Sequence, residues 1–104
     1  MKSDNLQILM PVHNEANNIG KQITKISNIL KKKIKFTFLI CEDGSDDGTL
    51  EILKKLQRKF KIKIISKKKK QGYSIAVMSG IKSASGDYLL IMDSDGQCDP
   101  KQIF

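Results

Sequence analysis

Short, mostly apolar strand-like runs alternate with segments of helical periodicity along this chain, and this alternation restricts the fold more than any other feature. The runs fall at residues 6–12, 36–41, 62–65 and 87–92. Between them, helices are expected at 15–32, 52–60 and 74–81; the first carries an apolar stripe of Ile19, Ile23, Ile26 and Leu30. Strands that are apolar throughout are buried on both faces, which is typical of parallel sheets covered by helices. The sequence therefore predicts an α/β fold of order β-α-β-α-β-α-β, with a mostly parallel sheet and right-handed crossovers.

The length and composition fit one globular unit. The chain has 104 residues, of which 39% are hydrophobic and 29% charged, and this excludes a collagen, a disulfide scaffold and a wholly disordered chain. About twelve residues follow the last predicted strand, without a finishing element, so we expect residues 1–104 to form a single, partial domain. An unfinished sheet exposes apolar surface and a strand edge, which predicts marginal stability or self-association.

Charge and cysteine usage narrow the partners and the compartment. The formal net charge is +8, and Arg58 is the only arginine. A lysine-rich surface favours anionic partners, but we expect no nucleic acid, because aromatic residues are few and no helix-turn-helix or RNP motif is present. Cys41 and Cys98 form no CxxC motif and no secretory leader precedes them, which indicates the reducing cytoplasm. No apolar run could span a bilayer, so any membrane contact is expected to be peripheral, at the cytoplasmic face.

Acidic residues collect just after three of the predicted strands. In an open parallel sheet, ligands bind outside the carboxyl ends of the strands. Converging carboxylates repel one another unless a cation lies among them, and oxygen ligands suit Mg²⁺ or Mn²⁺ carrying a phosphorylated ligand. Asp93 and Asp95 are the clearest pair, because residues i and i+2 at a strand end point to the same side. Eight of the 11 acidic residues belong to this group: Glu15, Glu42, Asp43, Asp46, Asp47, Asp93, Asp95 and Asp99.

Structural interpretations compete for most of these positions. Asp-Gly pairs such as 95–96 are common in turns. The residues at 45–47 are suited to capping the second helix, His13 and Asn14 to a turn and a helix cap, and Glu15 to a first helical turn. Asp43 is the hardest to explain structurally, since a carboxylate at a strand tip can accept hydrogen bonds from a base or a ribose. The four lysines at 67–70 are either a solvated loop or an electrostatic lip for a diphosphate or an anionic membrane.

Three motifs in order suggest a family. No G-x-G-x-x-G follows the first strand and no P-loop motif occurs, which argues against an NAD site and a P-loop NTPase. The motifs are PVHNE at 11–15, EDGSDDGT at 42–49, and GYSIA at 72–76 leading through Gly86-Asp87 to DSDGQ at 93–97. With these motifs the chain resembles the N-terminal, nucleotide-binding half of family 2 glycosyltransferases with the GT-A fold. The resemblance covers about residues 6–104, and the end of the third motif with Asp99-Pro100 looks most like the branch that transfers sugars to polyprenyl or dolichyl phosphate.

The resemblance implies a role for each matching position. Asp43 would contact the base, usually uracil or guanine. Asp93 would lie near the ribose and the metal, and Asp95 would coordinate Mg²⁺ or Mn²⁺ against the diphosphate. His13 stands where the family often has an aromatic residue, and Glu42 where it often has Asp. These two departures leave the identity of the nucleobase undecided. The remaining nucleotide-binding positions would be Pro11, His13, Glu15 and Gly72.

The resemblance also implies an activity, which is inverting transfer of a sugar from a UDP- or GDP-linked donor. The acceptor would be a polyprenyl or dolichyl phosphate or a saccharide, as in the building of cell-envelope polysaccharide. The acceptor half and the catalytic base would lie beyond Phe104, so no catalytic residue is assigned within the chain. The alternative is a truncated sugar-nucleotide-binding module without transferase activity.

Overall fold

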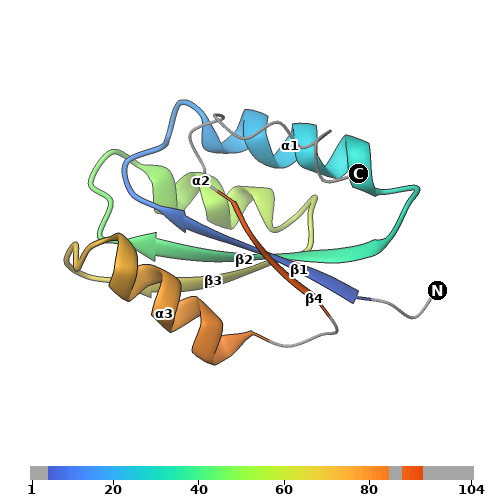
Figure 1. The fold of residues 1–104 in the computed structure, drawn as a ribbon. Helices are drawn as coiled ribbons and strands as arrows, with labels where there is room; N and C mark the ends of the chain where they lie inside the picture. Colours follow the sequence, from blue (N-terminus) through green and yellow to red (C-terminus); the bar gives the residue numbers. More distant parts are fainter. Residues whose placement is uncertain (1–4, 85–87, 93–104) are drawn as a thin grey trace.

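A computed structural model describes residues 5–84 and 88–92 and confirms the alternating pattern (Figure 1). Helix α1 begins at Ile19 rather than at Glu15, because residues 15–18 form a turn. In that turn, the Glu15 carbonyl oxygen accepts the N–H groups of Asn18 and Ile19 at 3.0 and 2.8 Å. The elements are β1 (Asn5–Val12), α1 (Ile19–Leu30), β2 (Lys35–Asp43), α2 (Thr49–Leu56), β3 (Ile62–Lys67), α3 (Tyr73–Ser83) and β4 (Tyr88–Ile91).

The four described strands form one parallel sheet in the order β3-β2-β1-β4. β1 pairs with β2 from Asn5↔Lys35 to Val12↔Glu42, and with β4 from Leu6↔Tyr88 to Leu9↔Ile91. The chain thus adds β2 and β3 on one side of β1 and then returns to place β4 on the other. In open α/β sheets, ligands bind at such a reversal of strand order, outside the carboxyl ends of the strands.

Helices cover both faces of the sheet (Figure 1). α1 and α2 lie over one face, where side chains such as Ile8, Met10, Phe38 and Ile40 form the larger core with α1. α3 lies over the other face, where its Ala76 forms a smaller cluster with Leu9, Leu39 and Cys41 of the sheet.

α3 approaches the sheet closely at Gly80. A Cβ atom there would lie 2.4 Å from Leu9 Cδ1 and 2.6 Å from Cys41 Sγ. Burial also raises the pKa of the Cys41 thiol to about 11, although Lys67 acts in the opposite direction. The absence of a side chain at Gly80 therefore lets the helix seal this thiol against the sheet.

Large apolar side chains remain exposed on α3 and on β4, in keeping with the apolar surface expected from the sequence. They are Tyr73, Ile75, Met78, Ile81, Tyr88, Leu89 and Ile91. Self-association through such a surface stays a prediction. Across residues 5–84 and 88–92, none of the helices combines the length and the apolar character needed to cross a membrane.

Candidate functional site

The predicted site residues within the described ranges all lie at the carboxyl edge of the sheet. Pro11 is near the end of β1, Asp43 ends β2, and Gly72 directly precedes α3. His13 and Glu15 follow β1 in the connection to α1. Asp93 and Asp95 lie outside the described residues, so their placement stays a prediction.

Pro11 fits this position because of the hydrogen-bonding direction of its strand. The Leu9 carbonyl oxygen accepts the Met92 N–H at 2.9 Å, so the backbone groups of Leu9 face β4. Residues alternate in direction along a strand, so Pro11 faces the same way. The register with β4 ends at Leu9↔Ile91, and the missing N–H of Pro11 costs no ladder hydrogen bond among the described residues.

Asp43 connects three segments of the chain. Its side chain is only 3% exposed. Its Oδ1 accepts the N–H of Gln71 at 2.8 Å and its Oδ2 accepts the N–H of Gly72 at 2.9 Å. The Nδ1–H of His13 donates to the Asp43 carbonyl oxygen at 2.6 Å. The structure therefore brings together His13, Asp43 and Gly72, three of the residues predicted to bind nucleotide.

The lysine-rich loop after β3 is fixed against the turn after β2. Gly44 adopts φ +65°, and a Cβ atom there would lie 2.3 Å from Lys70 N and 2.5 Å from Lys69 C. Two backbone segments thus meet where no side chain fits. Lys68, Lys69 and Lys70 are exposed, and their backbone is held beside Asp43. The loop therefore lies at the carboxyl edge of the sheet. Both interpretations of its lysines, binding a diphosphate or being solvated, remain open.

The loops after β1 and β2 are joined by side-chain hydrogen bonds. The Asn14 N–H donates to Ser45 Oγ, and Asn14 Oδ1 accepts the Asp46 N–H, both at 2.9 Å. The Glu15 N–H donates to Thr49 Oγ1 at 3.0 Å. Asn14 has φ +53°, a left-handed conformation that Asn tolerates better than most residues. Asn14 bridges the two loops instead of capping α1, so the prediction of a helix cap was wrong.

The capping prediction for residues 45–47 also needs correction. Gly48 occupies the N-cap position of α2 and no side-chain cap bond is formed there. Ser45 and Asp46 bind Asn14 instead. Asp47 does reach the helix start, where its Oδ1 accepts the Thr49 N–H at 3.1 Å and the Thr49 hydroxyl.

Asp47 and Glu15 both accept hydrogen bonds from residues of the connection between β1 and α1. Asp47 Oδ2 accepts the Ala16 N–H at 3.2 Å. The Thr49 hydroxyl, followed by the Ala16 and Thr49 amides, holds the pKa of Asp47 below its ordinary value. Glu15 lies before α1 rather than in its first turn, and its Oε1 accepts Asn18 Nδ2 at 3.1 Å.

Glu42 is a buried carboxylate whose structural role the sequence analysis missed. It is 2% exposed, its Oε2 accepts the Ser45 N–H, and its Oε1 accepts the Ser66 hydroxyl at 2.9 Å. Glu42 and Ser66 are also register partners in β2 and β3. The signal was available, because a charged residue that continues an apolar strand requires hydrogen-bond donors around it.

These contacts show what surrounds the described members of the converging carboxylates. N–H and O–H donors already compensate Glu42, Asp43 and Asp47. Within the described part of the chain, no group of three or more His, Cys, Asp or Glu residues could hold a metal ion. The metal prediction therefore depends on Asp93 and Asp95.

The sequence matches the model of a known protein family. The model described as glycosyl transferase family 2 matches residues 7–104. The chain belongs to glycosyltransferase family 2. A dolichol-phosphate mannosyltransferase of Pyrococcus furiosus is 34% identical over 98 residues, which is 94% of this chain and 28% of that protein. Glycosyltransferase AglE of Haloferax volcanii is 33% identical over 98 residues, 93% of this chain and 32% of that protein. The chain thus spans about a third of the length of these family 2 relatives.

Solved structures agree on the fold. A mannosyltransferase from Pyrobaculum calidifontis, in complex with GDP-Man and Mn²⁺, superposes with a TM-score of 0.74 at 19% identity, covering 86% of this chain and 27% of that one. S. aureus TarS 1–349, in complex with UDP-GlcNAc, gives a TM-score of 0.78 at 23% identity, covering 99% of this chain and 29% of that one. The α/β fold of the GT-A type, predicted from the sequence, is confirmed.

Proposed function

We propose that this chain carries the donor-nucleotide site of an inverting family 2 glycosyltransferase, at the carboxyl edge of β1 and β2. The observation that carries the proposal is the hydrogen-bonded connection of His13, Asp43 and Gly72 at that edge. It lies outside the carboxyl ends of the strands, where open α/β sheets bind their ligands, and His13 follows β1, the strand that borders the reversal of strand order.

The described residues supply a preorganised site for the nucleoside part. Two loop amides hold the Asp43 carboxylate, so the loop is already ordered before a ligand binds. Each Asp43 oxygen keeps a further lone pair, which an N–H donor of uracil or guanine would use. His13, Glu15 and Pro11 lie at the same edge. The exposed lysines at 68–70 would attract the diphosphate.

A divalent cation would belong to Asp93 and Asp95 rather than to the described carboxylates. Among the described residues, no group of three or more His, Cys, Asp or Glu side chains could hold a metal ion. Bound Mg²⁺ or Mn²⁺ would neutralise negative charge on the departing nucleoside diphosphate.

The donor and the acceptor follow from the relatives as proposals. The donor is a UDP- or GDP-linked sugar, in keeping with the GDP-Man and UDP-GlcNAc held by the structural neighbours. The acceptor is a polyprenyl or dolichyl phosphate, in keeping with the relative named as a dolichol-phosphate mannosyltransferase; a saccharide is the second choice. A phosphate acceptor is already anionic near neutral pH and depends less on a general base.

Calorimetric titration of the 104-residue chain with UDP and with GDP, with and without Mn²⁺, tests the donor site. We expect Mn²⁺-dependent binding of one nucleotide, abolished by Asp95→Asn and weakened by His13→Ala. Glu51→Gln removes the same charge from the exposed start of α2 and should leave binding unchanged. A folded chain that binds neither nucleotide would refute the donor site, and full binding by Asp95→Asn would refute the metal role.

A second experiment separates transfer from binding alone. The protein should transfer labelled sugar from the preferred donor to dolichyl phosphate. Binding without transfer to any lipid phosphate or saccharide would instead select the sugar-nucleotide-binding module.

A further inference from the structure

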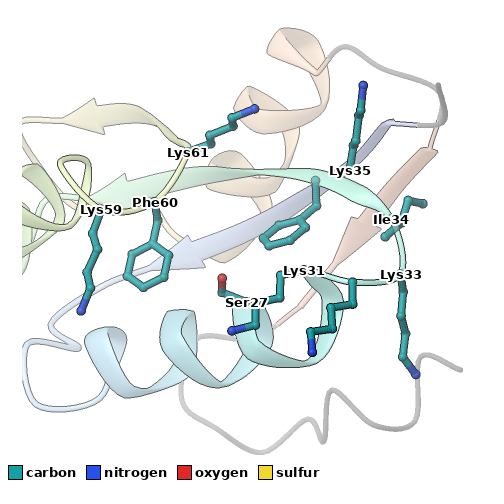
Figure 2. Close-up of a pocket in the computed structure, with 10 residues that line it drawn as sticks. Ser27, Lys31, Lys33, Ile34, Lys35, Lys59, Phe60 and Lys61 are labelled. Atoms are coloured by element: carbon teal, nitrogen blue, oxygen red, sulfur yellow. The ribbon is translucent and has the colours of Figure 1, made fainter. Parts of the chain in front are cut away.

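The end of the sheet opposite the candidate site holds a recess rich in lysine (Figure 2). Its volume is about 530 Å³, and it lies between the end of α1, the connection to β2 and the connection from α2 to β3. We call it the lysine recess. Six of its ten lining residues are lysines and none is acidic: Lys31, Lys32, Lys33, Lys35, Lys59 and Lys61.

The wall of the lysine recess is apolar. Ile34, Phe36 and Phe60 line it and are only half-buried, with Ser27 of α1 beside them. Figure 2 shows Phe60 beside Lys59, with Lys31 on α1 across the recess, whereas Lys61 and Lys35 extend away from the ring. A half-buried aromatic wall with lysines along its rim suits a ligand with a charged head and an apolar body.

Charge strengthens this interpretation. The lysines come from two stretches of chain, 31–35 and 59–61, that the fold brings to one end of the sheet. Like charges gathered around one hollow repel one another, and a bound anion would remove that repulsion. A phosphate group offers several acceptor oxygens at once, whereas each ammonium group supplies donors only.

The concave shape indicates a single molecule as the occupant. Apolar side chains that insert into a membrane must project, but Ile34, Phe36 and Phe60 are recessed among the lysines. The ligand must therefore bring its own apolar part into the hollow. A volume of about 530 Å³ is within the range of small-molecule sites.

We propose that the lysine recess binds a phosphate monoester carrying an apolar chain. The site is separate from the donor site, because β2 begins at the recess with Lys35 and ends at the carboxyl edge with Asp43. Nine strand residues span about 30 Å. Occupation of the recess should therefore leave UDP or GDP binding unchanged, and either proposal can fail without the other.

Octyl phosphate, below its micelle concentration, is the probe for the folded 104-residue chain, followed by calorimetry. We expect it to bind at least about tenfold more tightly than inorganic phosphate or uncharged octyl glucoside, since neither offers both parts. Ser27→Glu places a carboxylate in the recess as an internal competitor and should weaken binding about tenfold. Thermal melting would confirm that each variant is folded.

Two matched variants isolate the effect of a negative charge inside the lysine recess. Ser27→Gln has the size of the Glu variant without its charge. Asn28→Glu makes the same charge change at an exposed neighbour outside the lining. Both should stay within about threefold of the parent chain. Equal losses in Ser27→Glu and Asn28→Glu would overturn the proposal in favour of diffuse surface charge. Equal affinity for inorganic phosphate or for octyl glucoside would overturn it as well.

Vesicles distinguish the source of the phosphate. Sedimentation with phosphatidylcholine vesicles containing phosphatidic acid, lost in Ser27→Glu, would identify a membrane lipid as the ligand. Binding of octyl phosphate without sedimentation would identify a soluble phosphate ester. Tighter, Ser27→Glu-sensitive binding of a single-stranded oligonucleotide would overturn the proposal and assign the recess to nucleic acid.

Discussion

Substituting Gly44 by alanine tests how the carboxyl edge is assembled. The new Cβ atom would lie 2.3 Å from Lys70 N, 2.5 Å from Lys69 C and 3.0 Å from Lys69 Cα. All three are backbone atoms, so no side chain can rotate away. The loop must shift, and it carries the amides of Gln71 and Gly72 that Asp43 binds.

A second glycine of the same turn separates the clash from backbone strain. Gly48 has φ +91°, and a Cβ atom there would meet nothing within 4 Å, whereas Gly44 has φ +65° and the clash described. Alanine in the left-handed region costs about 1–2 kcal/mol at either site. Overpacking against atoms that cannot rotate away adds about 1–3 kcal/mol at Gly44 alone. We therefore expect Gly44→Ala to be less stable than Gly48→Ala by about 1–3 kcal/mol.

Urea unfolding followed by circular dichroism measures both free energies, and nucleotide titration measures the functional effect. Gly44→Ala should also weaken nucleotide binding, because the amides that position Asp43 move with the loop. Gly48→Ala serves as the control in both assays. Equal losses of stability in the two variants would refute the close backbone contact, and unchanged nucleotide binding by Gly44→Ala would refute the role of the loop.

Three further outcomes are expected. Gly80→Ala should lower the free energy of unfolding by about 1–3 kcal/mol, because its Cβ atom would meet Leu9 and Cys41. The control Gly20→Ala should not lower it, because a Cβ atom at Gly20 meets nothing within 4 Å. Equal melting temperatures of the two variants would contradict this. Burial raises the Cys41 pKa from 9.0 to about 11, so the unfolded chain loses this proton first and the free energy of unfolding should fall as pH rises from 9 to 11. Denaturant titrations across this pH range should show a shallower fall for Cys41→Ala than for the parent chain. Parallel curves for the two chains would argue against a buried thiol. The chain should sediment as larger species at higher concentration. Leu89→Lys should reduce this self-association, because Leu89 is exposed on β4. A parent chain that stays monomeric at all concentrations would contradict the prediction.

The fold was predictable because its signals are local. Apolar runs indicated the strands, and their alternation with helices required a parallel sheet with ligands at the carboxyl edge. The start of α1 was not predictable, because residues 14–16 are held by the loop after β2, in contacts such as Asn14 with Ser45. Those contacts depend on the tertiary structure and leave no local periodicity.

The candidate site was predictable in place but only partly in chemistry. Asp43 was predicted at a strand tip, and it lies there. That its two oxygens accept the amides of Gln71 and Gly72 was not predictable, because those donors come from a distant segment whose path depends on β3. Glu42 shows the same limit, since its partner Ser66 becomes a neighbour only when β3 pairs with β2.

The strand order also implies an order of folding. Leu6 pairs with Phe36 on one side and with Tyr88 on the other, so β4 must close a far longer stretch of chain than β2 does. Loop-closure entropy places β4 at a disadvantage of about 0.9 kcal/mol relative to β2. Among the described residues, β4 also pairs with β1 over four positions, whereas β2 pairs with it over eight. The β1–β2 pair, with α1 packed on it, is therefore expected to form first, and β4 to dock last and to be the first strand whose amides exchange with solvent.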